Sequence, residues 1–366
     1  MTMPIPRPVS RRGFLGLGAL LAGAAAPAMA QTMPHHASHH SQTHGSPLSE
    51  RPAGVHGGVL PAGTVNHARN GFDPYAMLTD WDTGTLTRDA QGRTVRAFTI
   101  VAEEKDIEIA PGILYPAWTY NGRVPGPALR VVEGERVRVT FINHTSMPHT
   151  MHFHGIHAAR VDGLTGAGEP EPGERFVYEF DAFPFGCHLY HCHTAPLSPH
   201  IQRGLYGMFV IDPDPARHGE LADAARSRLL GTAENARWQE LMMVMASFDL
   251  NGDEKNEVYS VNTVANIYAD RPILLDRTRP VRIYLLNMTE FDPINSFHVH
   301  ANFFDYYDHG TTLTPTLRTV DTVMQCQGQR GLLEIDFSRQ EPGSFMFHAH
   351  QAEFSDKGWM GHFEVA

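Results

Sequence analysis

The sequence predicts an all-β protein built from two β-sandwich domains. Short runs of β-branched and aromatic residues recur along the chain between glycines and prolines, a pattern typical of strands in an antiparallel sandwich or barrel. The runs form two sets, and residues 214–237 break the pattern between them. The two sets share a weak repeat of histidine motifs, which favours two copies of one sandwich.

The first domain is expected at residues 71–213 and the second at residues 238–366. Strands of the first are predicted at 95–102, 129–132, 137–142, 176–180 and 208–211. Strands of the second are predicted at 241–246, 281–287, 331–337 and 361–365. Residues 214–237 contain a stretch rich in Ala, Arg, Glu and Leu, which predicts a linker with one helix.

Residues 1–30 have the features of an export signal. Arg11 and Arg12 precede an apolar run at 15–26, and Ala28-Met29-Ala30 offers a small-residue cleavage site. The run is too short to span a bilayer, so no membrane anchor is expected. Paired arginines are typical of a twin-arginine signal, which predicts a periplasmic or secreted protein.

Residues 31–70 are rich in His, Ser, Pro and Gly, which predicts a flexible tail. Histidines cluster in it at positions 35, 36, 39, 40 and 44. This cluster could bind copper loosely or be a solvated tail without a fixed site.

The composition excludes some classes of function. The 366-residue chain has a net charge of −11 and no basic block, so it lacks the electrostatic footprint of a nucleic-acid binder. It contains 23 His and only 3 Cys, a ratio unlike that of disulfide scaffolds and cysteine-rich zinc modules. Such a composition favours imidazole ligation of copper, iron or zinc.

The tripeptide His191-Cys192-His193 is the strongest local motif. In an extended segment alternate side chains face opposite sides, so Cys192 would face away from both histidines and the tripeptide could serve two metal sites. A thiolate with two imidazoles selects copper, and His200 downstream offers one such imidazole. The alternative for an isolated motif is a buried cysteine beside incidental histidines.

Histidine pairs of the form H-x-H occur twice in each half of the chain. The pairs are His152 with His154, His191 with His193, His298 with His300, and His348 with His350. Each pair would project from one face of a strand. A single pair could be structural, but four pairs in a two-fold repeat predict metal binding.

Together with the motifs at 118–127 (Trp-Thr-Tyr-Asn-Gly-Arg-Val-Pro-Gly-Pro) and 149–155 (His-Thr-Met-His-Phe-His-Gly), these residues resemble the multicopper oxidases. The resemblance covers residues 93–366 and is to the two-domain laccase-like forms, which share cupredoxin domains with copper nitrite reductases. It implies two cupredoxin-like Greek-key sandwiches.

The resemblance also implies four coppers per chain. Position by position, the type 1 copper ligands would be His149, Cys192 and His200, with the non-ligand Leu205 at the axial position and Met208 three residues out of register. The remaining ligands would be His152 and His298 for type 2 copper, and His154, His191, His193, His300, His348 and His350 for the type 3 pair. Asn295 and Ala349 replace the type 1 His and Cys in the second domain, so one type 1 site per chain is expected.

The expected function is oxidation of a donor by one-electron steps, coupled to reduction of dioxygen to water. Phenols, aromatic amines, copper(I) and a protein all fit as donors. One alternative is a copper nitrite reductase, which by resemblance has an Asp where this chain has His152. Another is a protein that stores copper or confers resistance to it.

Several further expectations concern single residues and assembly. Asp162 and Glu353 lie close in sequence to ligand histidines, so either could deliver protons to the cluster or be an ordinary hydrogen-bonding or surface acid. Cys187 and Cys326 could pair in an exported protein, although the sequence shows no proximity. The resemblance implies a homotrimer with copper clusters between neighbouring chains.

Overall fold

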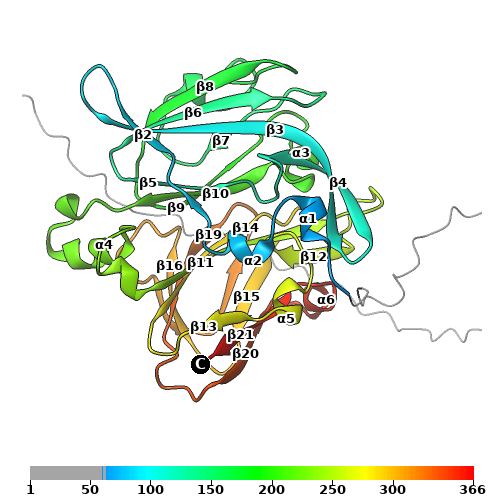
Figure 1. Cartoon of the computed structure of the whole chain (residues 1–366), viewed down its shortest axis with the longest axis vertical. Coiled ribbons are helices and arrows are strands. Elements are labelled where there is room, and N and C mark those ends of the chain that lie inside the picture. The colour runs from blue at the N-terminus through cyan, green and yellow to red at the C-terminus, as the bar shows by residue number, and fades with distance from the viewer. Residues whose placement is uncertain (1–59, 61–62) are drawn as a thin grey trace, which may run out of the picture. The chain divides into compact units, whose positions relative to one another are not determined.

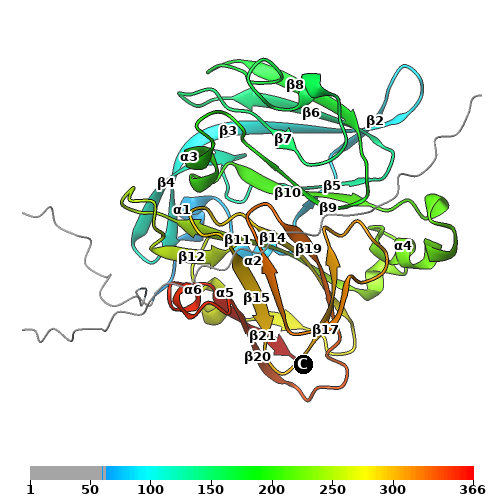
Figure 2. The same ribbon diagram turned by 180° about the vertical axis from the view of Figure 1, so that it is seen from behind.

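The computed structural model describes Leu60 and residues 63–366. In this part, the strands form two β-sandwiches whose sheets lie in four layers (Figure 1, and from behind in Figure 2). The predicted all-β class is confirmed. The predicted export signal at 1–30 and the histidine cluster at 35–44 lie outside the described residues.

The first sandwich has an outer and an inner sheet. The outer sheet contains β2 (Thr85–Arg88), β3 (Thr94–Ala110), β6 (Arg136–Asn143) and β8 (Arg175–Asp181), with β4 (Ile113–Tyr120) paired to β3. The inner sheet contains, in spatial order, β1 (Trp81–Asp82), β5 (Ala128–Val132), β10 (Tyr206–Asp212), β9 (Gly186–His191) and β7 (His152–Phe153).

The second sandwich is built in the same way. Its inner sheet contains β12 (Val258–Val261), β11 (Gln239–Phe248), β14 (Val281–Asn287), β19 (Arg330–Ile335), β16 (Phe304–Asp308) and β17 (Leu317–Val320). Its outer sheet contains β13 (Ile273–Leu275), β21 (Met360–Val365), β20 (Gly343–His348), β15 (Asn295–Val299) and β18 (Thr322–Gln325).

Strand direction repeats between the sheets that carry the histidine pairs. In the first sandwich β5 runs parallel to β10, which is antiparallel to β9, and β9 is antiparallel to β7. In the second, β13, β21, β20 and β15 follow the same order and directions. His152 lies opposite His191 in one sheet, and His298 lies opposite His348 in the other. The repeat therefore extends to single histidines.

Three hydrophobic cores hold the four layers together. One lies inside each sandwich, and the third lies between the two inner sheets, where Leu189 and Met208 share a cluster with Val244 and Leu286. Full burial of each such side chain contributes about 1.5–3 kcal/mol relative to exposure. The two sandwiches of one chain are therefore packed as a continuous body.

A buried ion-pair network also joins the two inner sheets. Arg130 of β5 contacts Asp212 of β10 at 2.9 Å and Glu240 of β11 at 2.6 Å. Arg282 of β14 contacts the other oxygen of Glu240 at 3.0 Å. Since both arginines are 0–1% exposed, each charge depends on its partners, and removing one partner of such a network typically costs about 3–5 kcal/mol.

Helices are short and lie in the connections. They are α1 (His67–Asn70), α2 (Pro74–Met77), α3 (Leu197–Gln202), α4 (Ala222–Arg228), α5 (Ile267–Asp270) and α6 (Ala352–Asp356), with 3-10 turns at Ala159–Val161, Pro215–Arg217, Gly219–Leu221 and Asn235–Arg237. Across Leu60 and residues 63–366, no helix is long and apolar enough to cross a membrane.

The prediction of a flexible tail over residues 31–70 is wrong at the C-terminal end of this range, because α1 lies there. The buried side chain of Asn70 donates to the backbone oxygen of Glu108 at 2.9 Å and accepts from its backbone nitrogen at 2.8 Å. These two bonds attach α1 to β3, and a polar stretch needs no apolar periodicity to be attached in this way.

Candidate metal centre

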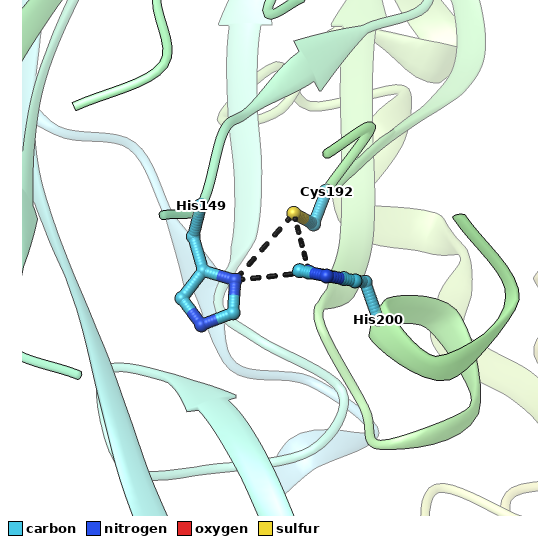
Figure 3. A group of neighbouring side chains, drawn as sticks. All are labelled: His149, Cys192 and His200. Carbon is cyan, nitrogen blue, oxygen red and sulfur yellow. Dashed lines mark hydrogen bonds between the residues drawn. The ribbon is translucent and has the colours of Figure 1, made fainter. Parts of the chain in front are cut away.

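His149, Cys192 and His200 converge inside the first sandwich (Figure 3). The Cys192 Sγ lies 3.7 Å from His149 Nδ1 and 3.2 Å from His200 Nδ1, and the two Nδ1 atoms are 3.0 Å apart. Atoms at these separations surround a point about 2 Å from each, the length of a bond from an imidazole nitrogen to a transition metal. The three donors fit one metal ion.

Strand alternation and a short helix bring these three side chains together. Cys192 follows β9 and faces the core of the first sandwich, while Leu189, three residues earlier, faces the core between the sandwiches. His200 is supplied by α3, and His149 lies just before β7. The backbone N–H of Thr150 donates to Cys192 Sγ at 3.4 Å, which orients the sulfur toward the histidines.

Burial leaves these imidazoles neutral. Burial, together with the neighbouring His200, lowers the pKa of His149 to about 3. Burial raises the pKa of the Cys192 thiol, against the opposing hydrogen bonds from Thr150 and Thr194. Neutral imidazoles present a lone pair, and a bound metal would stabilise the thiolate that burial alone disfavours.

Leu205 is the residue that the resemblance places at the axial position of the type 1 site. Leu205 is fully buried in the same core as Cys192, and its backbone oxygen accepts from the Cys192 N–H at 2.9 Å. Met208 belongs instead to the core between the sandwiches, because its side chain lies on the other face of β10. The Met208 thioether is thus directed away from the Cys192 sulfur.

A first histidine quartet surrounds β7 and the end of β9. The ring centre of His152 lies 5.2–5.3 Å from those of His154, His191 and His193. His154 Nε2 and His191 Nε2 are 3.3 Å apart. Burial lowers the pKa of His154 to about 2 and that of His191 to about 4, so both are neutral ligand candidates.

A second quartet occupies the equivalent place in the second sandwich. The ring centre of His298 lies 5.1–5.3 Å from those of His300, His348 and His350. His300 Nε2 and His348 Nε2 are 2.9 Å apart. The two quartets therefore share one geometry as well as one sequence pattern.

Hydrogen bonds to backbone oxygens orient one histidine of each quartet in the same way. Nδ1 of His152 lies 2.7 Å from the Asp162 backbone oxygen, and Nδ1 of His298 lies 2.9 Å from that of Asp321. A proton on each Nδ1 satisfies these bonds and leaves Nε2 free for a metal.

Hydroxyl groups support the last histidine of each quartet. Thr150 Oγ1 accepts from the His193 N–H at 2.7 Å, and Ser296 Oγ accepts from the His350 N–H at 2.8 Å. Sequence reasoning missed both hydroxyls. The signal was available, because Thr150 and Ser296 each follow the paired positions 149 and 295 of the repeat.

Each quartet is made by one sandwich alone. Within the described part of the chain, groups of donor atoms that lie within 4.8 Å of one another combine histidines of the first domain or of the second, never of both. The described part of the chain therefore presents two separate histidine quartets.

Comparison with known proteins identifies the family. Two protein-family models, both described as multicopper oxidase, match residues 102–216 and 240–366 of the sequence. The chain belongs to the multicopper oxidase family. A solved structure titled as a multicopper oxidase is 48% identical with a TM-score of 0.75, and the match covers 83% of this chain and all of that one.

Copper nitrite reductases are also relatives of this multicopper oxidase. The copper-containing nitrite reductase of Neisseria gonorrhoeae is 27% identical over 270 residues, which are 72% of this chain and 66% of that protein. The present chain thus spans slightly less than two thirds of that relative. The solved nitrite reductase of Nitrosomonas europaea is 25% identical with a TM-score of 0.63, covering 74% of this chain and 94% of that one.

Family membership makes copper the expected metal and confirms the cupredoxin-like fold. The donor chemistry of the sites agrees, since a thiolate with two imidazoles suits copper and imidazole clusters suit it equally. The chain thus belongs to a family of copper oxidoreductases.

Among the described residues, the second sandwich has no counterpart of the His149, Cys192 and His200 group. Asn295 stands in the place of His149 and Ala349 in the place of Cys192. The Asn295 side chain donates to Thr289 Oγ1 at 2.8 Å and accepts from the Trp359 indole N–H at 3.1 Å. Asn295 is therefore a structural residue, and the buried indole packs beside it.

The two acids expected near the cluster have different surroundings. The Asp162 carboxylate lies 3.3 Å from His152 Nδ1 and 3.8 Å from His157 Nε2. Glu353 pairs with Lys357 at 2.7 Å on α6, and its side chain is 66% exposed. Among the described residues, Glu353 hydrogen-bonds to no histidine, so Asp162 is the better placed of the two.

Arg330 of the second sandwich reaches the first quartet, which sequence reasoning did not anticipate. Its Nη1 lies 3.4 Å from His154 Nδ1, and its Nη2 donates to His188 Nδ1 at 3.3 Å. Its Nε donates to the Cys187 backbone oxygen at 3.1 Å. No local pattern marks Arg330, because its role depends on how the two sandwiches pack.

The proposed pairing of Cys187 with Cys326 is not present. Cys187 is buried and Cys326 is exposed, and both are free thiols. Burial raises the pKa of Cys187 to about 12, so this thiol is a neutral core residue at physiological pH.

Proposed function

We propose that the chain is a laccase-like oxidase that takes electrons singly from a donor and reduces dioxygen to water. The observation that carries this proposal is the pair of matched histidine quartets next to a single Cys-His₂ site. Eight imidazoles exceed what one mononuclear copper needs. They support the expected cluster of three coppers. Together with one copper at the type 1 site, this would make four coppers per chain.

Copper held by His149, Cys192 and His200 would accept single electrons from the donor. Copper held by the quartets would reduce dioxygen. The protein's part is to join the two. Cys192 is bonded through the main chain to His191 and His193, so a continuous covalent path leads from the sulfur to two cluster histidines. Asp162 can hold a proton beside His152 for delivery to reduced oxygen.

We further propose that the cluster is completed by a second chain in a homotrimer. Each quartet belongs to one sandwich, so a full set of eight histidines needs a junction between unlike domains. Large apolar side chains close in sequence to the quartets are exposed: Ile156, two residues after His154, at 70% and Phe303, three residues after His300, at 53%. Head-to-tail contacts that close into a ring would cover such surfaces.

Nitrite reduction is the second candidate, because several relatives carry that name. His152 argues against it, since the resemblance places an Asp there in nitrite reductases. The test uses copper-loaded protein reduced with dithionite under argon and then mixed with either dioxygen or nitrite. We expect reoxidation and uptake of dioxygen, with nitrite unchanged.

Two other outcomes decide between the rivals. Nitrite consumption without oxygen uptake would establish the reductase. Bound copper that reacts with neither would indicate storage. A Cys192→Ser control separates oxygen uptake driven through the type 1 site from uptake at the histidine cluster alone.

Export to the periplasm or medium by a twin-arginine route remains part of the proposal. Cell fractionation of the wild-type chain and of the Arg11→Lys, Arg12→Lys variant tests it. Retention of only the variant in the cytoplasm is expected.

A further inference from the structure

Arg330 brings a positive charge from the second sandwich to the first histidine quartet. It is the first residue of β19, whereas the quartet surrounds β7 and the end of β9. Its Nη1 lies 3.4 Å from His154 Nδ1, and its Nη2 lies 3.3 Å from His188 Nδ1. A guanidinium group can only donate hydrogen bonds. Both Nδ1 atoms are therefore acceptors and carry no proton.

His188 anchors one half of this guanidinium. The Nε2 of His188 lies 2.8 Å from the Pro184 backbone oxygen. Because that oxygen can only accept, the ring proton of His188 is on Nε2, and Nδ1 is left with a lone pair for Arg330. Arg330 Nε also donates to the Cys187 backbone oxygen at 3.1 Å. Two contacts outside the quartet thus hold the guanidinium against β9.

The neutral His154 ring carries its proton on Nε2, and a second contact independently requires this. His154 Nε2 is 3.3 Å from His191 Nε2. His191 Nδ1 lies 2.9 Å from the Cys192 backbone oxygen, so the proton of His191 is on Nδ1 and its Nε2 is an acceptor. His154 Nε2 therefore donates to His191, while His154 Nδ1 accepts from Arg330.

Four other quartet histidines have the opposite arrangement at Nδ1. In each of them Nδ1 donates to a backbone oxygen, which leaves Nε2 free for a metal; they are His152, His191, His298 and His348. The equivalent of His154 in the second sandwich is His300, which contacts His348. Among the described residues, no arginine hydrogen-bonds to His300. The contact with Arg330 therefore distinguishes His154 from its counterpart.

A metal at His154 Nε2 is incompatible with the hydrogen bond from Arg330. The metal takes the lone pair of Nε2, so the proton of the neutral ring has to move to Nδ1. The Nδ1–H of His154 would then face the Nη1–H of Arg330, and two donors would meet. Nη1 also donates to the Gly328 backbone oxygen at 3.1 Å, so Arg330 keeps a partner when it leaves His154.

We propose that Arg330 is a positioning residue that copper must displace from His154. The inference rests on the proposed role of His154 as a copper ligand. The contact weakens copper binding at His154 by the same factor by which copper weakens the contact. Because Arg330 belongs to the second sandwich, copper loading of the first quartet is coupled to the packing between the two sandwiches.

Arg330→Gln tests the proposal. The Nε2 of a Gln lies at the same place along the side chain as the Nε of Arg, so it can still donate to the Cys187 oxygen, whereas both Nη atoms are lost. Copper per chain is measured by mass spectrometry after dialysis against increasing concentrations of EDTA. The variant should retain its copper to about ten-fold higher EDTA than the wild-type chain, the lower end of what a hydrogen bond to a charged group contributes. The near-ultraviolet absorption of the type 3 pair identifies the copper that is retained.

Arg318→Met is the matched control for the loss of one positive charge from the second sandwich. The Arg318 side chain is 68% exposed and pairs with Asp305 at 3.5 Å. This variant should retain copper as the wild-type chain does. If Arg330 instead held the copper site together, or stabilised a His154 ring that had lost both protons, Arg330→Gln would lose copper at lower EDTA. That loss, or unchanged retention, overturns the proposal.

A second test needs only the wild-type chain. Neutron diffraction from crystals of the copper-depleted protein should locate the His154 proton on Nε2. After copper loading, the proton should be on Nδ1, and Arg330 Nη1 should lie beyond hydrogen-bond distance from it, while the contact of Nη2 with His188 remains. A proton on His154 Nδ1 before loading, or an unchanged contact with Arg330 after loading, contradicts the proposal.

His154→Ala separates this inference from the proposed function. The same EDTA series should show that this variant loses copper of the type 3 pair. Unchanged copper in His154→Ala would remove the ligand role of His154 and the inference with it. Loss of copper in His154→Ala without a gain in Arg330→Gln would leave the proposed oxidase and remove only the role of Arg330.

Discussion

Trp359 occupies in the second sandwich the position that Leu205 occupies in the first. The backbone oxygen of Leu205 accepts from the Cys192 N–H at 2.9 Å, and that of Trp359 accepts from the Ala349 N–H at 3.3 Å. The Leu205 N–H donates to the His200 oxygen at 3.2 Å, and the Trp359 N–H donates to the Phe354 oxygen at 2.9 Å. The indole ring of Trp359, which is larger than the Leu205 side chain, therefore lies where a second type 1 site would have its axial residue.

Trp359→Ala should destabilise the protein without changing its type 1 copper. Trp359 is fully buried, and removal of such a side chain leaves a cavity that costs about 3–5 kcal/mol. Urea denaturation monitored by far-UV circular dichroism measures the loss. Leu274→Ala, at a residue 70% exposed, serves as the control. A weakened blue absorption in Trp359→Ala would indicate that the two sandwiches are coupled at the copper site.

Cys192→Ser should abolish the blue absorption and the oxidation of donors. A hydroxyl is a poor copper ligand, whereas the eight histidines of the quartets are unchanged. Copper analysis should show that the cluster metals remain and that one copper per chain is lost. An intense blue band in the variant would refute the assignment of Cys192.

Leu205→Met should lower the reduction potential of the type 1 copper. The alkyl group of Leu205 cannot donate to the metal, and the absence of an axial thioether favours copper(I). Redox titration of the blue band checks this. Met208→Leu is the matched control and should leave the potential unchanged, because Met208 faces the core between the sandwiches. A rise in potential in Leu205→Met would show that Leu205 is not axial.

The metal-depleted protein should lose stability in acid, and His188 should contribute. Burial and, to a smaller extent, the nearby Arg330 lower the pKa of His188 to about 4 from the ordinary 6.5. Between those two values the unfolded chain binds a proton that the folded chain does not. The free energy of unfolding therefore falls as pH drops from 6.5 toward 4, by up to about 1.4 kcal/mol per pH unit for each such residue.

Comparison with His188→Gln isolates this contribution. Gln can donate to the Pro184 oxygen, as His188 Nε2 does at 2.8 Å, but it does not titrate. Urea denaturation at several pH values between 4.5 and 6.5 should give a shallower pH slope for the variant. Identical slopes would mean that His188 is protonated in the folded protein.

Co-expression of His154→Ala and His350→Ala chains tests the trimer. Each variant alone breaks every cluster in a ring of identical chains. A mixed ring has one junction at which an intact first domain meets an intact second domain. We expect partial recovery of oxygen uptake in mixed trimers isolated with two affinity tags. No recovery in verified mixed trimers would place the whole cluster within a single chain.

Local patterns were sufficient to predict part of the sandwich strands and the four H-x-H pairs. The strand predicted at 281–287 matches β14, because five of its seven residues are β-branched, aromatic or other apolar residues. β3 was predicted to end at 102 but continues to Ala110. Its second half is polar, and it is held by backbone pairing with β4 and by burial of Ile107 and Ile109 between the sandwiches.

The features that could not be predicted depend on packing between distant segments. Arg330 reaches His154 across the boundary between the two sandwiches. Gln202 Nε2 donates to Asn256 Oδ1, 54 residues away, at 3.4 Å. No periodicity in the sequence encodes either contact, whereas an H-x-H pair in a strand carries its own geometry.

The Arg130 network between the inner sheets has a consequence for how such a chain can change. Arg130 and Glu240 come from different sandwiches and are both buried, so a substitution on one side removes one of the partners of a buried charge on the other. Consider a chimera that joins the first sandwich of this chain to the second sandwich of a relative. It should fold only if the two sandwiches supply matching partners for each buried ion pair. Substitutions in the two sandwiches are therefore coupled at this boundary, although the two sandwiches differ at the type 1 position.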